Sequence, residues 1–311
     1  MPGESRRVVV TGGAGFIGSH VCDRFLEQGY EVVALDDIST GNRDNVPADA
    51  RLEEIDIVDG GAVSRLFAEF RPNVVAHLAA QSSVTVSVKT PERDLDVNVR
   101  GTFNVLQAAT SVGAPTVFAS TGGALYGARA PIPTAEEDVP PEPLAPYGAS
   151  KLAGEAYVGT WGRLHGIPNV VLRLGNVYGE RQTPHGEAGV VAIFSDHIHR
   201  GVAPTVYGDG LQTRDYIHVY DVSRAFLVAG ESGRAGTFNV GTAKETTVLA
   251  LLETLIAAAG SSVEPRFEPL RTGELLRSCL DSTRLQTELG WQPTVALDQG
   301  LRETLATYAA A

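Results

Sequence analysis

The chain has 311 residues, of which 43% are hydrophobic and 20% are charged, an ordinary balance for a globular protein with a large core. Its 37 acidic residues outnumber the 25 basic ones, and the formal net charge of −12 disfavours binding to nucleic acid. No run approaches the ~20 apolar residues that cross a bilayer. Two cysteines, Cys22 and Cys279, are too few for a disulfide framework or a cysteine metal site. We therefore expect a cytoplasmic protein with no metal, membrane or nucleic-acid partner.

From residue 7 to residue 174, short apolar runs alternate with longer amphipathic segments. The predicted strands are 7–11, 31–35, 51–55, 74–78, 116–119 and 170–174, and the predicted helices are 16–28, 62–70, 95–111 and 146–165. Alternation of this kind is typical of a doubly wound parallel sheet with helices on both faces. The sequence therefore predicts an α/β fold with a Rossmann-type sheet.

A glycine-rich turn joins the first predicted strand to the first predicted helix. It reads Thr11-Gly12-Gly13-Ala14-Gly15-Phe16-Ile17-Gly18, with Gly12, Gly15 and Gly18 at every third position. Glycine suits a tight turn in which the backbone approaches a pyrophosphate and the helix packs closely on the strand. Because a strand precedes the turn and a helix follows it, the turn predicts a dinucleotide site that includes Phe16 and Ile17.

The end of the second predicted strand indicates which dinucleotide binds. Asp36 lies 18 residues beyond Gly18. A carboxylate there accepts hydrogen bonds from ribose hydroxyls and repels a 2′-phosphate, so NAD is favoured over NADP. The residues expected to line the same crevice are Asp37 beside it, Asp56 and Ile57 after the third strand, and Leu78, Ala79 and Ala80 after the fourth.

Tyr147 and Lys151 stand four residues apart at the start of a predicted helix, a spacing that places both side chains on one face. A tyrosine phenol ionises near pH ~10, so it needs a positive charge nearby to act as a base at neutral pH. The pair therefore predicts general acid–base catalysis. The Pro-rich segment 131–146 separates a strand from this helix, and we interpret it as an active-site loop.

After residue 174 the elements become shorter, with two late helical patterns near 247–259 and 298–309. Such a region can cover the carboxyl ends of the strands, where ligands bind in open α/β sheets. We expect residues 1–174 to form mainly the NAD-binding domain, including the helix of Tyr147. Residues 175–311 are expected to form mainly the substrate-binding region, with some chain crossing between the two.

With the glycine turn, Asp36, His77-Leu78-Ala79-Ala80 and Tyr147-x-x-x-Lys151 in this order, the chain resembles an extended short-chain dehydrogenase/reductase. It is more closely similar to the bacterial UDP-glucose (UDP-galactose) 4-epimerases, over nearly its whole length. The further motifs that carry the likeness are Asn98, Gly175-Asn176-Val177-Tyr178-Gly179, Gly186-Glu187-Ala188-Gly189-Val190-Val191, Thr213-Arg214-Asp215-Tyr216 and Arg271-x-Gly273-Glu274. The resemblance implies NAD-dependent epimerisation of a UDP-hexose at C4 through a transient 4-keto sugar. It also implies a homodimer, formed through helices 95–111 and 147–165.

The resemblance implies roles for individual residues as well. Tyr147 would accept the proton, Lys151 would also hold the nicotinamide ribose, and Asn98 and Ser120 would lie beside the cofactor. Arg214 and Arg271 resemble a diphosphate clamp, a role that suits the planar guanidinium fork. The other implied substrate contacts are Asn176 at the diphosphate or sugar, and Gly189, Val190, Thr205, Val206 and Tyr207 on the nucleobase side.

Three positions differ within the family or depart from its pattern. Gly122 stands where the family usually carries a Ser or Thr that hydrogen-bonds the sugar 4-oxygen, and Thr121 is our candidate replacement. Glu274 stands where Asp is common, which would shift a contact to ribose. Ser278 falls where some members carry a bulky tyrosine, and its small size predicts room for an N-acetyl group on the sugar.

Three alternatives remain open from the sequence. A nucleotide-sugar 4,6-dehydratase needs an added acid and base, and this chain has Gly123-Ala124 where the family's dehydratases carry Asp-Glu. A UDP-glucuronate 4-epimerase needs a cation for the substrate carboxylate, for which Arg181 and His185 are candidates. A non-catalytic NAD-binding sensor or scaffold would be expected to lose Tyr147 or Lys151, and both are present.

Overall fold

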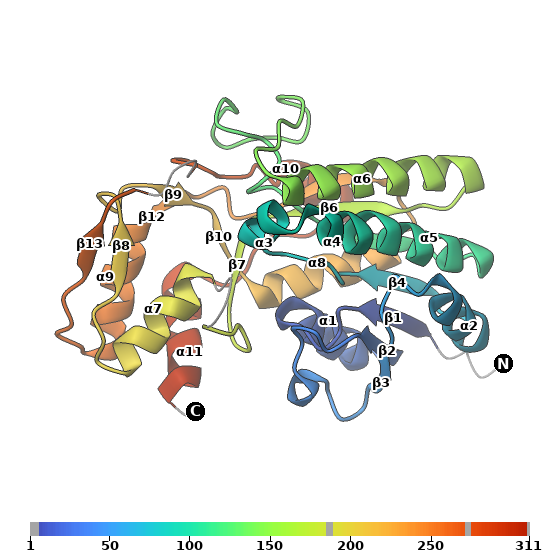
Figure 1. Cartoon of the computed structure of the whole chain (residues 1–311), viewed down its shortest axis with the longest axis horizontal. Coiled ribbons are helices and arrows are strands. Elements are labelled where there is room, and N and C mark those ends of the chain that lie inside the picture. The colour runs from blue at the N-terminus through green and yellow to red at the C-terminus, as the bar shows by residue number, and fades with distance from the viewer. Residues whose placement is uncertain (1–5, 185–188, 271–274, 310–311) are drawn as a thin grey trace.

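The computed structural model describes residues 6–184, 189–270 and 275–309, and its centre is a seven-stranded sheet (Figure 1). The strand order is β11-β6-β5-β4-β1-β2-β3, and each neighbouring pair in this sheet is parallel. The strands are β1 (Arg7–Thr11), β2 (Glu31–Asp36), β3 (Arg51–Glu54), β4 (Val74–His77), β5 (Thr116–Thr121), β6 (Val170–Leu174) and β11 (Gly236–Val240). The predicted α/β fold with a Rossmann-type sheet is confirmed.

Helices cover both faces of the sheet because its strands are apolar on both sides. In β1, Val8 and Val10 belong to one core cluster and Val9 to the other, as expected for a strand whose side chains alternate. Helices α1 and α8 pack on the first face, and α2 and α5 pack on the second with α6 beside α5. The helices are α1 (Phe16–Glu27), α2 (Gly60–Phe70), α5 (Thr102–Ser111), α6 (Pro146–His165) and α8 (Val219–Glu231).

The predicted helix 95–111 is divided in the structure. It begins in α4 (Pro91–Leu95), passes through a π-helical segment, η2 (Asp96–Gly101), and continues as α5. A short helix, α3 (Val84–Lys89), precedes it. Wider π-helical turns occur mostly as single-turn insertions and frequently at functional sites, and η2 contains Asn98.

The chain crosses back into the first sheet after residue 174. Helix α8 packs on α1, and β11 pairs in parallel with β6 to become an edge strand of the large sheet. The large sheet is therefore completed by elements from the second half of the sequence.

Most of the remaining elements form a smaller lobe at one end of the sheet, on the left in Figure 1. Its core joins α7, α9 and α11 to the short strand β8. The lobe and its connections contain β7 (Asn176–Tyr178), α7 (Val190–His199), β8 (Thr205–Tyr207), β9 (Thr213–Arg214), β10 (Tyr216–His218), β12 (Thr246–Thr247), α9 (Val248–Ala259), β13 (Arg266–Glu268) and α11 (Leu297–Ala309). Helix α10 (Thr283–Leu289) packs on β11 of the large sheet instead, with Leu285 in the core of its first face. Within the three described ranges, no helix combines the length and apolar character needed to cross a membrane.

Candidate functional site

The glycine turn between β1 and α1 is packed so closely that side chains are excluded. Gly12 has φ 73°, and a Cβ on it would lie 2.8 Å from the amide nitrogen of Ala79. A Cβ on Gly18 would lie 2.0 Å from the carbonyl oxygen of Gly12. Gly15 is the N-cap of α1, which begins at Phe16, and the first amides of a helix are suited to bind phosphate. This turn has the form that a bound pyrophosphate requires.

Asp36 ends β2 and is only 7% exposed. Its two carboxylate oxygens accept hydrogen bonds from the backbone N–H groups of Ala14 at 3.0 Å and Ile38 at 2.9 Å. Burial raises the pKa of this carboxyl, and the two N–H groups lower it. Each oxygen keeps a further acceptor position, which fits the ribose hydroxyls of NAD. Asp37 is exposed instead, and it accepts hydrogen bonds from the N–H and hydroxyl groups of Ser39.

The structure places the other predicted crevice residues directly after β3 and β4, namely Asp56, Ile57, Leu78, Ala79 and Ala80. Leu78 and Ala79 donate their backbone N–H groups to the hydroxyl of Thr11, each at 3.1 Å. These bonds tie the end of β4 to the glycine turn. Ile57 is buried, whereas Asp56 is exposed and accepts the N–H of Val58.

Asn98 is 1% exposed and is held by protein partners. Its side-chain oxygen accepts the N–H of Gln81 at 2.8 Å. Its side-chain NH₂ lies within hydrogen-bond distance of the carbonyl of Gln81, the hydroxyl of Ser150 and a carboxylate oxygen of Asp94. The predicted cofactor neighbour therefore joins η2 to α6 one residue before Lys151.

Tyr147 and Lys151 lie one turn apart at the start of α6, and both interact with β5. Lys151 is 4% exposed and donates from Nζ to the carbonyl oxygen of Ala119 at 3.0 Å. Its Nζ also lies 4.9 Å from the ring centre of Phe118. Thr121, the last residue of β5, lies close enough to Tyr147 for hydrogen bonding by its side chain to lower the pKa of the phenol. The predicted acid–base pair and the predicted hydroxyl neighbour are thus brought together.

Burial dominates the proton affinities of this pair. It raises the pKa of Tyr147 to about 12, whereas the hydrogen bond with Thr121 lowers it and the charge of Asp94 raises it. Burial lowers the pKa of Lys151 to about 8, whereas the carboxylates of Asp94 and Glu155 raise it. Lys151 is therefore mainly protonated at pH ~7, while Tyr147 alone would keep its proton.

Gly122 has no space for the hydroxyl side chain that is usual in the resembled family. A Cβ on it would lie 2.5 Å from Cδ1 and 2.6 Å from Cδ2 of Leu280. Gly122 and Ser278 line the same small cavity. The leucine side chain therefore occupies the space beside Gly122, and Thr121 supplies the hydroxyl that contacts Tyr147.

The predicted sugar and diphosphate residues come from β7, β9 and the segment before α10. Asn176 lies near the segment between β5 and α6 (residues 122–145), which we call the catalytic loop, with its side-chain oxygen 3.8 Å from the position of a Cβ on Gly123. Arg214 donates from its guanidinium to the carbonyl of Thr213 at 2.8 Å. The same carbonyl accepts the backbone N–H of Ser278, which is 8% exposed.

The predicted nucleobase residues lie on α7 and β8 in the smaller lobe. Gly189 is the N-cap of α7 and Val190 is its first residue, while β8 consists of Thr205, Val206 and Tyr207. The side chain of Val206 is fully buried in the lobe core, so only its backbone can face a ligand. The predicted residues Arg271 and Glu274 lie outside the described residues.

A buried ion pair that sequence reasoning missed lies behind the site. Glu155 of α6 and Arg173 of β6 are joined at 2.7 Å, with side chains only 7% and 8% exposed. Two signals were available. Arg173 interrupts an otherwise apolar strand, and Glu155 lies four residues after Lys151 on the same helix face. Across the described chain, no group of three His, Cys, Asp or Glu side chains is placed to hold a metal ion.

Residues 8–241 match the model of the NAD dependent epimerase/dehydratase family. The chain belongs to this family. A curated relative, the UDP-glucose 4-epimerase of Mycolicibacterium smegmatis, is 45% identical over 97% of this chain and 98% of its own length. The family membership confirms the resemblance that the ordered motifs indicated.

Solved structures of family members agree with the fold. The UDP-glucose 4-epimerase of Thermotoga maritima, solved with UDP-glucose, has a TM-score of 0.95 and 43% identity, covering 98% of this chain and 99% of that one. The UDP-glucose 4-epimerase of Thermus thermophilus, solved with NAD, has a TM-score of 0.92 and 45% identity, with the same coverage.

Proposed function

We propose that this protein is a UDP-glucose 4-epimerase, an isomerase that uses bound NAD to invert C4 of a UDP-hexose through a transient 4-keto sugar. The observation that carries the proposal is the position of Tyr147 and Lys151, which meet the end of β5 on one face of α6. The crevice that ends in Asp36 suits NAD, and similarity to UDP-glucose 4-epimerases over nearly the whole chain supports the same reaction.

Residues of the chain would remove the proton of the sugar 4-hydroxyl and later return it. Bound NAD⁺ supplies a hydride acceptor and a positive ring charge. We assign to Tyr147 the removal of the proton and its later return from the same oxygen. Thr121 holds the phenol in place through their hydrogen bond. Lys151, fixed by the carbonyl of Ala119, supplies a positive charge that favours the phenolate.

The nucleotide part of the substrate must be held firmly while the keto sugar rotates between the oxidation step and the reduction step. We assign the diphosphate to Arg214 and Arg271, whose forks suit phosphate oxygens. Asn176 is assigned a contact at the diphosphate or sugar. The absence of a side chain at Gly123 and the small side chain of Ser278 leave room for the sugar to rotate.

Two other reactions of related enzymes are less well supported. Dehydration needs an acid and a base where this chain has Gly123-Ala124. Uronate recognition needs a free cation, but Arg181 is paired with Asp23 at 2.7 Å. The other candidate for uronate binding, His185, lies outside the described residues. The pairing of Arg181 with Asp23 supports a neutral hexose as the substrate.

The test is to incubate the purified protein with a panel of UDP, dTDP, GDP and CDP sugars and to identify the products. We expect the C4 epimer from UDP-glucose and UDP-galactose. Tyr147→Phe should retain NAD, measured as nucleotide released on denaturation, and should lose activity by about 10²-fold or more. Accumulation of a 4-keto-6-deoxy sugar would contradict epimerisation. Stoichiometric NAD without turnover of any sugar would instead favour a sensor or scaffold.

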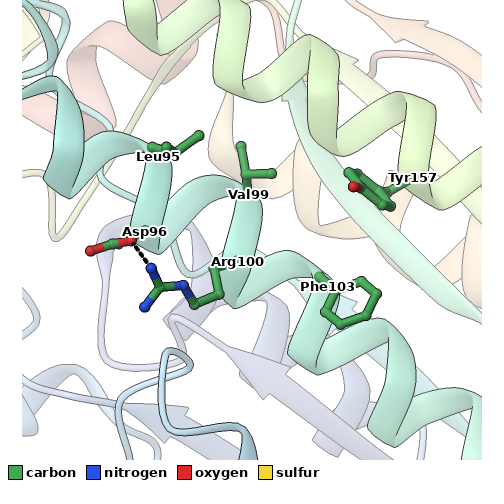
Figure 2. Close-up of a pocket in the computed structure, with 6 residues that line it drawn as sticks. All are labelled: Leu95, Asp96, Val99, Arg100, Phe103 and Tyr157. Atoms are coloured by element: carbon green, nitrogen blue, oxygen red, sulfur yellow. Dashed lines mark ion pairs between the residues drawn. The ribbon is translucent and has the colours of Figure 1, made fainter.

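We also propose that the protein is a homodimer joined through η2, α5 and α6. Figure 2 shows a shallow pocket on this surface, where Leu95, Val99 and Phe103 lie along one helix beside Tyr157 of α6. Leu95 is 58% exposed and Tyr157 is 41% exposed. Apolar side chains gathered on adjacent helices favour a helical partner, and a second copy of the same surface would complete a four-helix contact.

The remaining expectations concern location and organisation. We propose a cytoplasmic protein, because Cys22 and Cys279 are both free and buried, which suits a reducing compartment. We also propose that residues 1–174 mainly bind NAD and that residues 175–311 mainly bind the nucleotide sugar. Helices α8 and α10 and strand β11 are the exceptions, since β11 completes the large sheet and the two helices pack against its core.

A further inference from the structure

The ion pair between Glu155 and Arg173 is the centre of a buried polar network. Arg173 donates from Nε to Oε1 of Glu155 at 2.9 Å and from a terminal nitrogen to Oε2 at 2.7 Å. Its other terminal nitrogen donates to the hydroxyl of Tyr126 at 2.9 Å. That hydroxyl donates to the side-chain oxygen of Asn239 at 2.7 Å. The guanidinium thus joins α6, the catalytic loop and the edge strand β11.

The same pair touches the strand that carries the proposed catalytic contacts. Oε1 of Glu155 accepts the hydroxyl of Ser120 at 2.5 Å. Ser120 stands between Ala119, whose carbonyl holds Lys151, and Thr121, which is bonded to Tyr147. Two successive residues of β5, Ala119 and Ser120, are therefore bonded to Lys151 and Glu155 of α6, and the next one, Thr121, lowers the pKa of Tyr147. The three α6 residues stand at four-residue intervals, which is the spacing of one helix face.

The charges around Lys151 come from several elements. On α6 itself, Tyr147 precedes it by one turn and Glu155 follows it by one turn. From α4, the buried carboxylate of Asp94 acts on it. From β4, His77 lies nearby, and burial together with the charge of Lys151 lowers its pKa to about 3, so it is neutral.

Glu155 can affect Lys151 without being an isolated buried charge, because Arg173 balances it. Burial lowers the pKa of Arg173, but the bonds to Glu155 and its charge raise it above the ordinary value, so the guanidinium stays charged. A buried charge is stable only when paired and hydrogen-bonded. Removing either partner leaves the opposite charge near the catalytic face of α6.

We infer that Glu155 and Arg173 are a positioning pair, which sets α6 against β5 and keeps the Lys151 ammonium charged where Tyr147 needs it. This inference rests on the proposed roles of Tyr147 and Lys151. It extends the site to two residues that would touch neither substrate nor cofactor. Glu155 acts through Ser120 and Lys151, and Arg173 acts through Glu155.

The composition of the chain makes a direct test practical. It contains three lysines, of which Lys89 and Lys244 are exposed and Lys151 is buried. Protein labelled with ¹³C at lysine Cε should therefore give three NMR signals, and a Lys151→Arg variant assigns the buried one. Its titration reports the pKa of Lys151 without any substrate or turnover.

The two single substitutions should move this pKa in opposite directions. Glu155→Gln removes an attractive charge and leaves Arg173 unbalanced, so the pKa of Lys151 should fall by about one pH unit. Arg173→Met leaves Glu155 unbalanced, so the pKa of Lys151 should rise, but by a smaller amount, because Arg173 acts on Lys151 only through Glu155. The high-pH limb of the kcat/KM pH profile should shift by the same amount and in the same direction as the pKa of Lys151. Activity is present below this pKa and lost above it. Glu288→Gln, the same change in an exposed ion pair with Arg284, should leave both unchanged.

The outcomes separate this inference from the proposed function. If the pKa of Lys151 is unchanged in both variants, or shifts in the same direction in both, the inference is wrong and the pair is merely structural. If the pKa shifts as expected but the high-pH limb of the kcat/KM profile does not shift with it, the role proposed for Lys151 is wrong instead.

Breaking a buried pair is strongly destabilising. Should neither single variant fold, Glu155→Gln/Arg173→Met leaves no unpaired charge, and its Lys151 pKa should lie below that of the wild type.

Discussion

At the scale of single residues, the structure explains how the site works without the usual hydroxyl at Gly122. Leu280 fills the space beside that glycine, so a side chain there would collide with it. The neighbouring Thr121 bonds to Tyr147 instead. Thr121 could be predicted because it is adjacent to Gly122. The contact with Leu280 could not be predicted, because Leu280 lies 158 residues beyond Gly122 in the chain. Packing between distant segments decides this feature.

Replacing Thr121 should change the pH dependence of the reaction. In the NAD-bound enzyme, the positive charges of the nicotinamide and Lys151 favour the phenolate and lower the pKa of Tyr147. The phenolate is the active form, so activity is present above this lowered pKa and lost as the pH falls through it. The Thr121 hydrogen bond lowers this pKa. Thr121→Ala should therefore shift the acid limb of kcat toward higher pH and reduce kcat at neutral pH by about tenfold.

Thr121→Ser is the matched control, because it keeps the hydroxyl and should keep the acid limb near its wild-type position. Both limbs can be read from initial rates of UDP-galactose conversion across pH. An alanine variant with the wild-type profile would show that Tyr147 depends on Lys151 and some other group.

Ser278 should govern which sugars fit. It is buried and lines the same cavity as Gly122, so a larger side chain would occupy space close to the catalytic loop. Ser278→Tyr should reduce kcat/KM on UDP-N-acetylglucosamine by about 10-fold or more, and it should largely spare UDP-glucose. Ser278→Ala controls for loss of the hydroxyl. Equal losses on both sugars would contradict a role in selecting the sugar.

At the scale of elements, regular patterns in the first half of the sequence were sufficient to predict most of the sheet. Strands β1 and β6 and helix α6 have the predicted bounds, because each has a clear period and clear ends. The π-helical segment η2 was not predicted, since its sequence continues an ordinary helical pattern. Helix α8 and strand β11 were also missed, because their place in the large sheet depends on long-range pairing.

The interface between β5 and α6 shows the same limit for the candidate site. The spacing of Tyr147 and Lys151 predicted a shared helix face, and the structure places both against β5. The spacing also puts Glu155 on this face, but the sequence does not show that Glu155 is buried and paired with Arg173. A glutamate on a helix is usually solvated, and only the fold shows that this one is buried.

At the scale of the whole molecule, the two lobes contribute different parts of the proposed active site. The large sheet and its helices contribute the glycine turn, Asp36 and the acid–base pair on α6, while β7, β9 and the smaller lobe contribute the residues assigned to the nucleotide sugar. The proposed dimer surface on η2, α5 and α6 lies on the helices that carry Asn98 and Lys151. Dimerisation would therefore stabilise α6, which carries Tyr147 and Lys151, through contacts on its outer face.

A charge placed on this outer surface should separate the dimer. Leu95 is 58% exposed in the single chain, and in a dimer it would be covered by apolar side chains of the second copy. Leu95→Asp should therefore shift the mass measured by sedimentation from dimer to monomer, because a buried unpaired carboxylate is costly. Leu211→Asp is the matched control, since Leu211 is 60% exposed but lies far from this surface in the chain, between β8 and β9. That variant should keep the wild-type mass. A wild-type protein that sediments as a monomer at micromolar concentration would overturn the proposed interface.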